Sequence, residues 1–492
     1  MNNLRTRLTA QVGEAFRQCG LDADLGTVAQ SGRPDLCQFQ CNGALAAAKR
    51  YRRNPMELAE SVAAALRSLD PTLSVSAAAP GFVNISVADS TLADAVDSMR
   101  RDSRLRLPVT DNPKTIVLDY GGPNTAKHLH VGHLRPAIIG DTMYRIARFY
   151  GHRVIGDAHI GDWGLPIGMV IATLLERNLQ VSDVPTDEFN DIYPEASLRS
   201  KSDPEFRKEA QRITRELHSG NERYLAIWRE ITAVSVADAK RNYAALNLLP
   251  FDFWYGESNA QPYIAPMLER LRERGLLELD GGAGIVHVRR EEDTEPMPPL
   301  IVTTSDGGEV YATTDLATIL QREQDFRPDE IWYFTDARQT LYFKQLFRAA
   351  ELAGLTGARC HHTGFGTVNG KDGKPYKTRS GEVMRLFDMI DDVREKLPDP
   401  RIACAAIRIA DMQNAPAKDY QFDMDKFTAR EGKTGPYLLY ACVRIAGVLA
   451  KSPERDSDAP ILPPASEKER TLMLAIESSG DFLERAFRDK AP

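Results

Sequence analysis

The chain has 492 residues, of which 62 are basic and 69 acidic, giving a net charge of −7. This length predicts two to four domains, and a content of 42% hydrophobic and 27% charged residues is typical of a globular protein rather than a disordered or fibrous one. No apolar run is long enough to span a membrane, and residues 1–16 resemble an amphipathic helix rather than a secretory signal, so we expect a cytoplasmic protein. The six cysteines are too scattered for a disulfide framework.

The first part of the chain, residues 1–105, predicts a small α/β domain. Helical patterns cover 3–19 and 56–69, and a turn at Pro80 and Gly81 leads into a strand that starts at Phe82. A charged link over residues 100–106 separates this domain from the rest of the chain.

From residue 114 the pattern changes to strand, loop, helix and strand. The strands are predicted over 115–120 and 153–160, and the helix over 133–150, closed by Gly151. Pro136 falls in the first turn of that helix, where proline is tolerated. A strand–helix–strand unit of this length predicts a parallel, doubly wound sheet that binds a nucleotide.

The rest of the chain alternates between helical and α/β regions. A charged helical region covers 186–245, and the α/β pattern returns with a strand at 330–335, a helix to about 353 and a strand at 361–368. From about 399 the chain is predicted to be helical, interrupted by a Pro-rich linker at 459–465. We therefore predict a core domain at 106–395, with a helical insertion at about 186–290, and a helical domain at 396–492.

The most informative segment is residues 124–133, which ends in His-Val-Gly-His. His130 and His133 lie three residues apart at a predicted helix N-terminus, where unpaired N–H groups and the helix dipole favour a phosphate. Gly132 would let a nucleotide approach the backbone. The pair could instead merely cap the helix, but the preceding strand, Pro123, Asn124 and Lys127 favour an ATP-phosphate site.

Two further segments would face the same crevice. The next predicted strand ends in His159-Ile-Gly-Asp-Trp-Gly164, and ligands of open α/β sheets bind beyond the carboxyl ends of the strands. A tight turn with a buried Trp163 and a solvated Asp162 is the alternative for this segment. Residues 369–381 form a Gly-rich basic loop that suits a polyphosphate, although such loops are more often solvated turns; its cations are Lys371, Lys374, Lys377 and Arg379.

A set of acidic and polar residues suits a planar cation. Tyr311 and Asp315 lie four residues apart where the chain enters a helix, so they can share one face. Together with Asp119 they would place two carboxylates near the strand ends, a geometry that fits the fork of a guanidinium group. Asp315 could equally be a charge at a helix N-terminus.

These segments resemble the arginyl-tRNA synthetases, a family of class I aminoacyl-tRNA synthetases. The resemblance extends over essentially the whole chain, and the segment 130–133 corresponds to the "HIGH" signature of the family. The other matching segments are Asp35 to Asn42, Asp119 to Lys127, Gly161 to Gly164, Tyr311 to Asp315, Asp336 to Gln339, Lys377 to Ser380 and Gly432 to Tyr437.

The resemblance implies a Rossmann-type catalytic core, an N-terminal α/β domain that contacts tRNA, and a helical C-terminal domain that reads the anticodon and looks shortened here. It implies that the carboxylate of L-arginine attacks the α-phosphate of ATP and that the arginyl group then passes to the 3′ end of tRNA-Arg. Magnesium would accompany ATP, without a tightly bound metal or organic cofactor.

The resemblance also implies roles for individual residues. His130, His133, Lys127 and Lys377 would act on the triphosphate, where Lys127 compensates for a lysine that the second signature loop has lost. The residues implied for ATP binding are Pro123, Asn124, His130, Gly132, His133, Lys377, Arg379 and Ser380. Those implied for arginine binding are Asp119, Asn124, His159, Tyr311, Asp315 and Gln339, and candidates for tRNA contact are Gln38, Gln40 and Tyr437.

The chain departs from the family at three positions, of which 128 and 166 border the crevice and 136 is expected to be benign. Residue 128 is His where the family usually has Pro, residue 136 is Pro where Ser is usual, and residue 166 is Pro where Gln is common. We expect a monomer that binds tRNA-Arg, L-arginine and ATP and no membrane. The main alternative is a paralogue that makes arginyl-adenylate for a different acceptor, and a more distant one is a non-enzymatic tRNA-binding protein.

Overall fold

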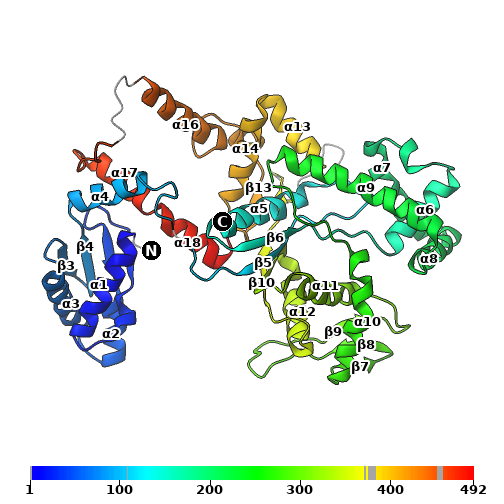
Figure 1. Cartoon of the computed structure of the whole chain (residues 1–492), viewed down its shortest axis with the longest axis horizontal. Helices are drawn as coiled ribbons and strands as arrows, with labels where there is room; N and C mark the ends of the chain where they lie inside the picture. The colour runs from blue at the N-terminus through cyan, green and yellow to red at the C-terminus, as the bar shows by residue number, and fades with distance from the viewer. Residues whose placement is uncertain (1–2, 108, 371–372, 375–383, 452–457) are drawn as a thin grey trace. The chain divides into compact units, whose positions relative to one another are not determined.

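The computed structural model describes residues 3–107, 109–370, 373–374, 384–451 and 458–492 (Figure 1). The chain forms two compact units: Met1–Val109 with Ser452–Arg488, and Thr110–Lys451 with Asp489–Pro492. Among the described residues, no helix has both the length and the apolar character that crossing a bilayer requires.

The first unit is an α/β domain built on an antiparallel sheet with the strand order β1-β2-β4-β3. Its core joins the buried faces of α1, α3 and the sheet, with Leu8, Phe16 and Leu58 fully buried. The predicted helices at 3–19 and 56–69 are confirmed. The elements are α1 (Leu4–Gln18), η1 (Ala23–Gly26), β1 (Val28–Gln30), β2 (Phe39–Cys41), α2 (Gly43–Tyr51), α3 (Pro55–Leu69), β3 (Ser74–Ala78), β4 (Phe82–Ser86) and α4 (Asp89–Arg100).

A helix from the end of the chain, α17 (Glu467–Glu477), also packs in this first unit. Leu474 joins its core, and Arg470 donates to both carboxylate oxygens of Asp89 at 2.7 and 2.6 Å. The backbone N–H of Leu4 donates to Glu477. The sequence predicted one helical domain over 396–492, whereas the structure places α17 in the first unit. The contacts that hold α17 there join residues far apart in the sequence, such as Arg470 and Asp89, so no local pattern indicates them.

The second unit is built on a four-stranded parallel sheet with the order β11-β10-β5-β6. Its strands are β5 (Thr115–Asp119), β6 (Arg153–Asp157), β10 (Glu330–Asp336) and β11 (Arg359–Phe365). The centre of β5 is fully buried, as a strand covered on both faces requires. Helix α5 (Leu134–Phe149) joins β5 to β6, and α12 (Thr340–Ala353) joins β10 to β11 in the opposite direction. The strand order therefore reverses between β5 and β10, which is where such sheets bind ligands.

The segments between β6 and β10 form a large insertion (Figure 1). The predicted helical region 186–245 is confirmed, but the insertion also holds an antiparallel sheet, β7-β8-β9, that was not predicted from the sequence. Each of its strands has four residues, and three of the four in β7 are exposed, so no alternating pattern marks it. The insertion comprises α6 (Leu165–Glu176), η3 (Val181–Asp183), α7 (Thr186–Ser202), α8 (Pro204–His218), α9 (Glu222–Ala245), α10 (Glu257–Glu273), β7 (Leu277–Asp280), β8 (Ala283–Val286), β9 (Leu300–Thr303) and α11 (Tyr311–Phe326).

After β11 the chain is mainly helical. The strand predicted at 361–368 is two strands, because the chain leaves β11 at Phe365 and then pairs in β12 (Val368–Asn369) with β13 (Tyr420–Gln421). The remaining elements are the short 3-10 turns η2 (Val131–His133) and η4 (Ala337–Gln339) and the helices α13 (Leu386–Lys396), α14 (Pro400–Met412), α15 (Met424–Phe427), α16 (Gly435–Ala450) and α18 (Ser479–Asp489).

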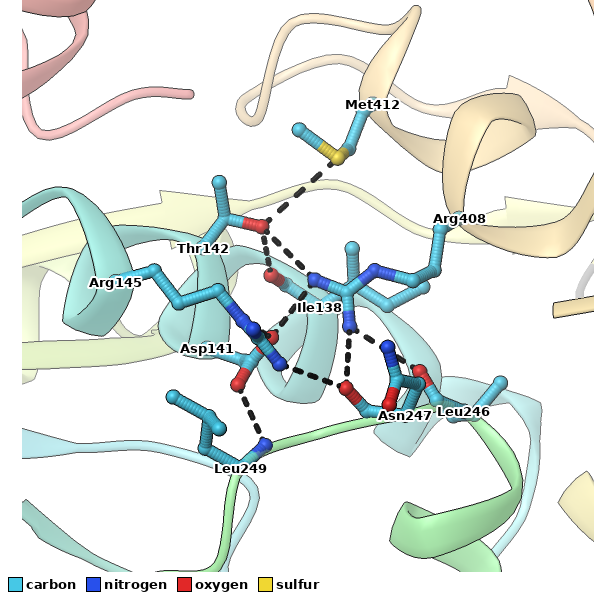
Figure 2. Close-up of polar contacts among 9 residues, drawn as sticks. All are labelled: Ile138, Asp141, Thr142, Arg145, Leu246, Asn247, Leu249, Arg408 and Met412. Atoms are coloured by element: carbon cyan, nitrogen blue, oxygen red, sulfur yellow. Dashed lines mark hydrogen bonds and ion pairs between the residues drawn. The ribbon is translucent and has the colours of Figure 1, made fainter. Parts of the chain in front are cut away.

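A buried carboxylate fixes α5 to its neighbours (Figure 2). Asp141 is fully buried, and its Oδ2 pairs with Arg145 on the same helix at 2.8 Å and with Arg408 of α14 at 2.7 Å. Its Oδ1 accepts the backbone N–H of Leu249, at 2.9 Å. Arg408 also donates to the carbonyl oxygen of Leu246, so α5, α14 and the turn after α9 are held together by one network.

Candidate active site

A cavity of about 1080 Å³ opens at the carboxyl ends of β5 and β10, where the strand order reverses. Its walls come from the end of β5, the start of α5, the end of β10 and the first turns of α11 and α12. Eight of the residues predicted for ATP and arginine line it: Asp119, His130, Gly132, His133, His159, Tyr311, Asp315 and Gln339.

On one wall, the rings of His130 and His133 lie against each other, with centroids 4.1 Å apart. His130 caps η2, and its Nδ1 accepts the backbone N–H of Gly132 at 3.0 Å. The Nδ1 of His133 accepts the N–H of His130 at 3.1 Å, with the His130 carbonyl oxygen at 3.2 Å from the same nitrogen. The Nδ1 of His130 accepts a hydrogen bond, so the neutral ring of His130 holds its proton on Nε2. The Nδ1 of His133 lies within reach of both an N–H and a carbonyl oxygen, and when it accepts the N–H its proton is likewise on Nε2.

The surroundings keep both rings neutral. Burial lowers the pKa of His133 to about 3, and the neighbouring His130 adds to this shift. Burial, and then the charge of Lys127, lower the pKa of His130. At neutral pH the pair therefore presents two Nε2–H donors without a full positive charge.

The absence of a side chain at Gly132 has a local steric cause, which does not depend on a nucleotide. A Cβ at this position would lie 2.7 Å from Cε1 and 2.8 Å from Nδ1 of His130, which is closer than side chains tolerate. The residue therefore leaves room for the ring of His130 in its capping position.

The two predicted carboxylates, Asp119 and Asp315, also line the cavity but differ in their partners. Asp119 accepts a hydrogen bond from Arg322 at 2.8 Å, and the same nitrogen of Arg322 also binds Asp157 at 2.7 Å. Arg322 is fully buried, so Asp119 already pairs with a guanidinium of the protein, whose single positive charge it shares with Asp157. Two carboxylates were predicted to be open to a ligand, but only that of Asp315 is without an arginine partner among the described residues.

Asp315 projects from the first turns of α11 and accepts a hydrogen bond from the hydroxyl of Tyr342. Burial raises its pKa, while Tyr342 and His159 oppose that change. Tyr311, at the start of the same helix, is 79% exposed at the mouth of the cavity.

Glu257, which begins α10, was not predicted from the sequence. Burial, and then the nearby charges of Asp162 and Asp315, raise its pKa to about 7. Asp162 is buried and binds the N–H and hydroxyl of Ser258 at 3.0 and 2.6 Å, so it fastens the start of α10 beside Asp315. Only the fold brings these positions together, and no local motif marks Glu257.

His159 lies between the two walls with both ring nitrogens buried and, among the described residues, without a hydrogen-bond partner. Buried ring nitrogens normally have a hydrogen-bond partner, so those of His159 can bind a polar group that enters the cavity. Gly122 lets the chain pass His159 closely, since a Cβ there would lie 1.9 Å from the carbonyl oxygen of His159.

The remaining predicted residues lie beside the cavity or outside the described part of the chain. Pro123 and Asn124 belong to a loop that is joined to Gly161 by backbone hydrogen bonds of 3.0 Å. The ammonium group of Lys127 lies 4.2 Å from the ring centre of Tyr193. Lys371, Lys377, Arg379 and Ser380 fall outside the described residues.

The three candidates for tRNA contact differ in exposure. Gln38 is buried and accepts the backbone N–H of Val87 at 2.8 Å, which favours a structural role. Gln40 is half-buried and donates to Asn84 at 2.9 Å. Tyr437, near the start of α16, is 44% exposed.

In the part of the chain that the structure describes, no group of three or more His, Cys, Asp or Glu side chains is placed to hold a metal ion.

Comparison with known proteins agrees with this geometry. The family model "tRNA synthetases class I (R), catalytic domain" matches residues 96–400, and "Arginyl tRNA synthetase N terminal domain" matches residues 2–87. The arginine–tRNA ligase of Alkaliphilus oremlandii is 44% identical over 527 residues, which cover 100% of this chain and 90% of the relative. That of Agathobacter rectalis is 42% identical over 537 residues with the same coverage.

Solved structures show the same fold. The arginyl-tRNA synthetase of Plasmodium falciparum superposes with a TM-score of 0.84 at 22% identity, covering 99% of this chain and 88% of that one. The Thermus thermophilus enzyme gives a TM-score of 0.81 at 21% identity, with the same coverage of both chains. The catalytic-domain model covers the residues of the crevice, and the relatives match this chain along its whole length. The chain therefore belongs to the arginyl-tRNA synthetase family of class I aminoacyl-tRNA synthetases.

Proposed function

We propose that this protein is an arginine–tRNA ligase, which activates L-arginine with ATP and transfers the arginyl group to the 3′ end of tRNA-Arg. The observation that carries this proposal is that one cavity holds both hydrogen-bond donors suited to a phosphate and a carboxylate suited to a guanidinium group. One part of the lining offers the neutral Nε2–H donors of His130 and His133, and another the half-buried carboxylate of Asp315.

In the first step, a carboxylate oxygen of arginine attacks the α-phosphorus of ATP. The bond from phosphorus to the bridging oxygen breaks, and pyrophosphate leaves with that electron pair. The Nε2–H groups of His130 and His133 donate to phosphate oxygens, whose charge increases in the transition state. Because both rings are already neutral and fixed by their Nδ1 bonds, they need no reorganisation during the reaction.

The arginine side chain would lie against Asp315. A carboxylate can accept two parallel N–H bonds from a guanidinium group, which a lysine ammonium cannot donate. We assign Glu257 to the surroundings of Asp315, because the charge of Asp315 helps to raise the pKa of Glu257, which itself lies outside the lining of the cavity. Tyr311, Gln339 and the free nitrogens of His159 would complete the polar contacts to arginine, and Asp119 would contribute through the wall that it forms with Arg322.

We assign Lys127 to the phosphates as well, since its charge already acts on both histidines. Pro123 and Asn124 would border the nucleotide, and Lys377, Arg379 and Ser380 would bind the departing pyrophosphate. Magnesium would enter as the complex with ATP and take its oxygen ligands largely from the phosphates.

In the second step, the terminal ribose hydroxyl of tRNA attacks the arginyl carbonyl and AMP leaves. We assign Gln40 and Tyr437 as candidate RNA contacts because part of each side chain is exposed. We also propose that the protein acts as a monomer.

The direct test is charging of tRNA-Arg by the full chain with labelled L-arginine. We expect charging with arginine and none with citrulline, which has nearly the same shape but no positive charge. Arginine-dependent ATP–pyrophosphate exchange without any charging would contradict the proposal, because it would mean that the adenylate is made for another acceptor.

A further inference from the structure

Helix α7 of the insertion contacts the residues that precede His130. The ammonium nitrogen of Lys127 lies 4.2 Å from the centre of the Tyr193 ring, and Nε2 of His128 lies 3.3 Å from a carboxylate oxygen of Asp191. Tyr193 and Asp191 both belong to α7. No motif in the sequence pointed to either residue.

Asp191 also contacts a second segment of the chain. Nη2 of Arg385 donates to its two carboxylate oxygens at 2.9 and 3.2 Å. Arg385 lies in a segment that runs antiparallel to residues 129–131. The N–H of Val131 donates to the carbonyl oxygen of Met384 at 3.0 Å, and the N–H of Leu386 donates to the carbonyl oxygen of Leu129 at 2.8 Å. One carboxylate of α7 therefore binds Arg385 and lies close to His128, so it contacts both segments of this pairing.

Lys127 needs such support if it is to act on a phosphate. A lysine side chain has four rotatable bonds, and fixing its ammonium in one place costs conformational entropy. A cation over an aromatic face is held electrostatically without losing its charge. Tyr193 can thus hold the Lys127 ammonium near His130 and His133, where its charge already acts on both rings.

We propose that Tyr193 and Asp191 are positioning residues through which α7 holds Lys127 and the segment 127–131 in place for the triphosphate of ATP. Tyr193 acts through Lys127, whereas Asp191 acts through His128 and Arg385. The inference rests on the proposed function, because it takes Lys127 as a phosphate-binding residue.

A double-mutant cycle between Tyr193 and Lys127 tests this inference. The variants are Tyr193→Leu, which keeps an apolar side chain but removes the aromatic face, Lys127→Met, and the two combined. Arginine-dependent ATP–pyrophosphate exchange is measured with tRNA-Arg present, and KM is determined separately for ATP and for arginine. Thermal melting confirms that each variant is folded.

We expect Tyr193→Leu to lower kcat/KM for ATP by roughly 3- to 30-fold, the range of a cation–π contact, with the KM for arginine unchanged. In the Lys127→Met background it should cause little further loss, since the contact is already gone. Tyr193→Phe keeps the aromatic face and should recover most of the loss. Glu195→Gln is the matched control, because Glu195 lies on the same helix but pairs with Arg177.

Asp191→Asn should also lower kcat/KM for ATP, but by the same factor in both backgrounds, because Asp191 does not act through Lys127. Equal losses from Tyr193→Leu with and without Lys127 would overturn the inference and leave a purely structural role for the tyrosine. Exchange as fast in Tyr193→Leu as in the wild type would also overturn it. Failure of the proposed function is distinct: the wild type would then show no arginine-dependent exchange, or Lys127→Met would be fully active.

Discussion

At the scale of single residues, partners decide which acidic groups in the crevice are open to a ligand. Asp119 and Asp315 are both carboxylates that line the cavity, but Asp119 already pairs with the fully buried Arg322, which it shares with Asp157. Asp315 instead accepts its side-chain hydrogen bond from the neutral hydroxyl of Tyr342. The guanidinium group of a bound arginine therefore gains more binding free energy from Asp315 than from Asp119, because it can form a charge-assisted hydrogen bond with Asp315 without displacing an existing ion pair.

Replacing Asp315 with alanine should raise the KM for arginine by roughly 10- to 100-fold, the effect expected when a hydrogen bond between charged groups is lost. The KM for ATP should stay nearly constant, because the histidine wall is unaffected. Steady-state exchange kinetics with tRNA-Arg present measure both values. Asp306→Asn is a suitable control, since Asp306 is exposed in the turn before α11, and arginine kinetics unchanged by Asp315→Ala would contradict this assignment.

Glu257 predicts a pH dependence. Its pKa is about 7 in the free protein, above the usual value for glutamate, because burial and the charges of Asp162 and Asp315 disfavour its ionised form. Below pH 7 the group is protonated and cannot pair with a guanidinium, so kcat/KM for arginine should rise with pH through about 7 and then level off. The slope below that pH should be at most ~10-fold per pH unit, as for a single ionisation.

The check is the pH profile of kcat/KM between about pH 5.5 and about pH 8, in the wild type and in Glu257→Gln. The glutamine variant should be slower and lack the rise. If the rise persists in Glu257→Gln, another group titrates there and the assignment of Glu257 is wrong.

At the scale of elements, α5 connects the reacting groups to the rest of the second unit. Its first turns follow directly on His130 and His133, and Arg135 in that region binds Asp411 of α14 at 2.9 Å while almost fully buried. Further along the helix, Asp141 binds Arg408 of α14 (Figure 2). Two buried ion pairs thus fix α5 to α14, so the histidines stand on an element that is held along its length.

Replacing Asp141 with alanine should lower the free energy of unfolding of the second unit by about 3 kcal/mol or more, because Arg408 loses its carboxylate partner in a largely buried place. Urea denaturation of the full chain measures this as a lower transition midpoint. Asp391→Ala removes an exposed pair with Arg394 and should change stability by less than about 1 kcal/mol. Similar effects of the two substitutions would show that the Asp141 network is not an important support.

Elements with a strong local pattern could be predicted from the sequence, and short or exposed ones could not. The unit β5–α5–β6 was predicted because each strand has an apolar centre and Gly151 ends the helix. The sheet β7-β8-β9 was missed because its strands are short and Leu279 in β7 is 78% exposed. The place of α17 in the first unit depends on Leu474 and Arg470, whose contacts lie far away in the sequence.

At the scale of the whole molecule, the crevice is assembled from segments that are distant in the chain. His130 and His133 were predictable because they form one compact motif, and Asp315 because it follows Tyr311 at helical spacing. Glu257, Arg322 and Tyr193 were not, because each acquires its role only from a contact with another segment. The fold and the core of the site could therefore be predicted, whereas the partners that tune each group required the structure.

The central claim is that the histidine wall and the carboxylate wall form one catalytic site for arginine activation. The most direct measurement is arginine-dependent ATP–pyrophosphate exchange with tRNA-Arg present, comparing the wild type, His133→Ala and, as a control, His287→Ala, whose side chain is 59% exposed. We expect exchange in the wild type and the control, and a turnover lower by roughly 10²-fold or more in His133→Ala, as for loss of a transition-state hydrogen-bond donor. A turnover in His133→Ala close to that of the wild type would contradict the claim.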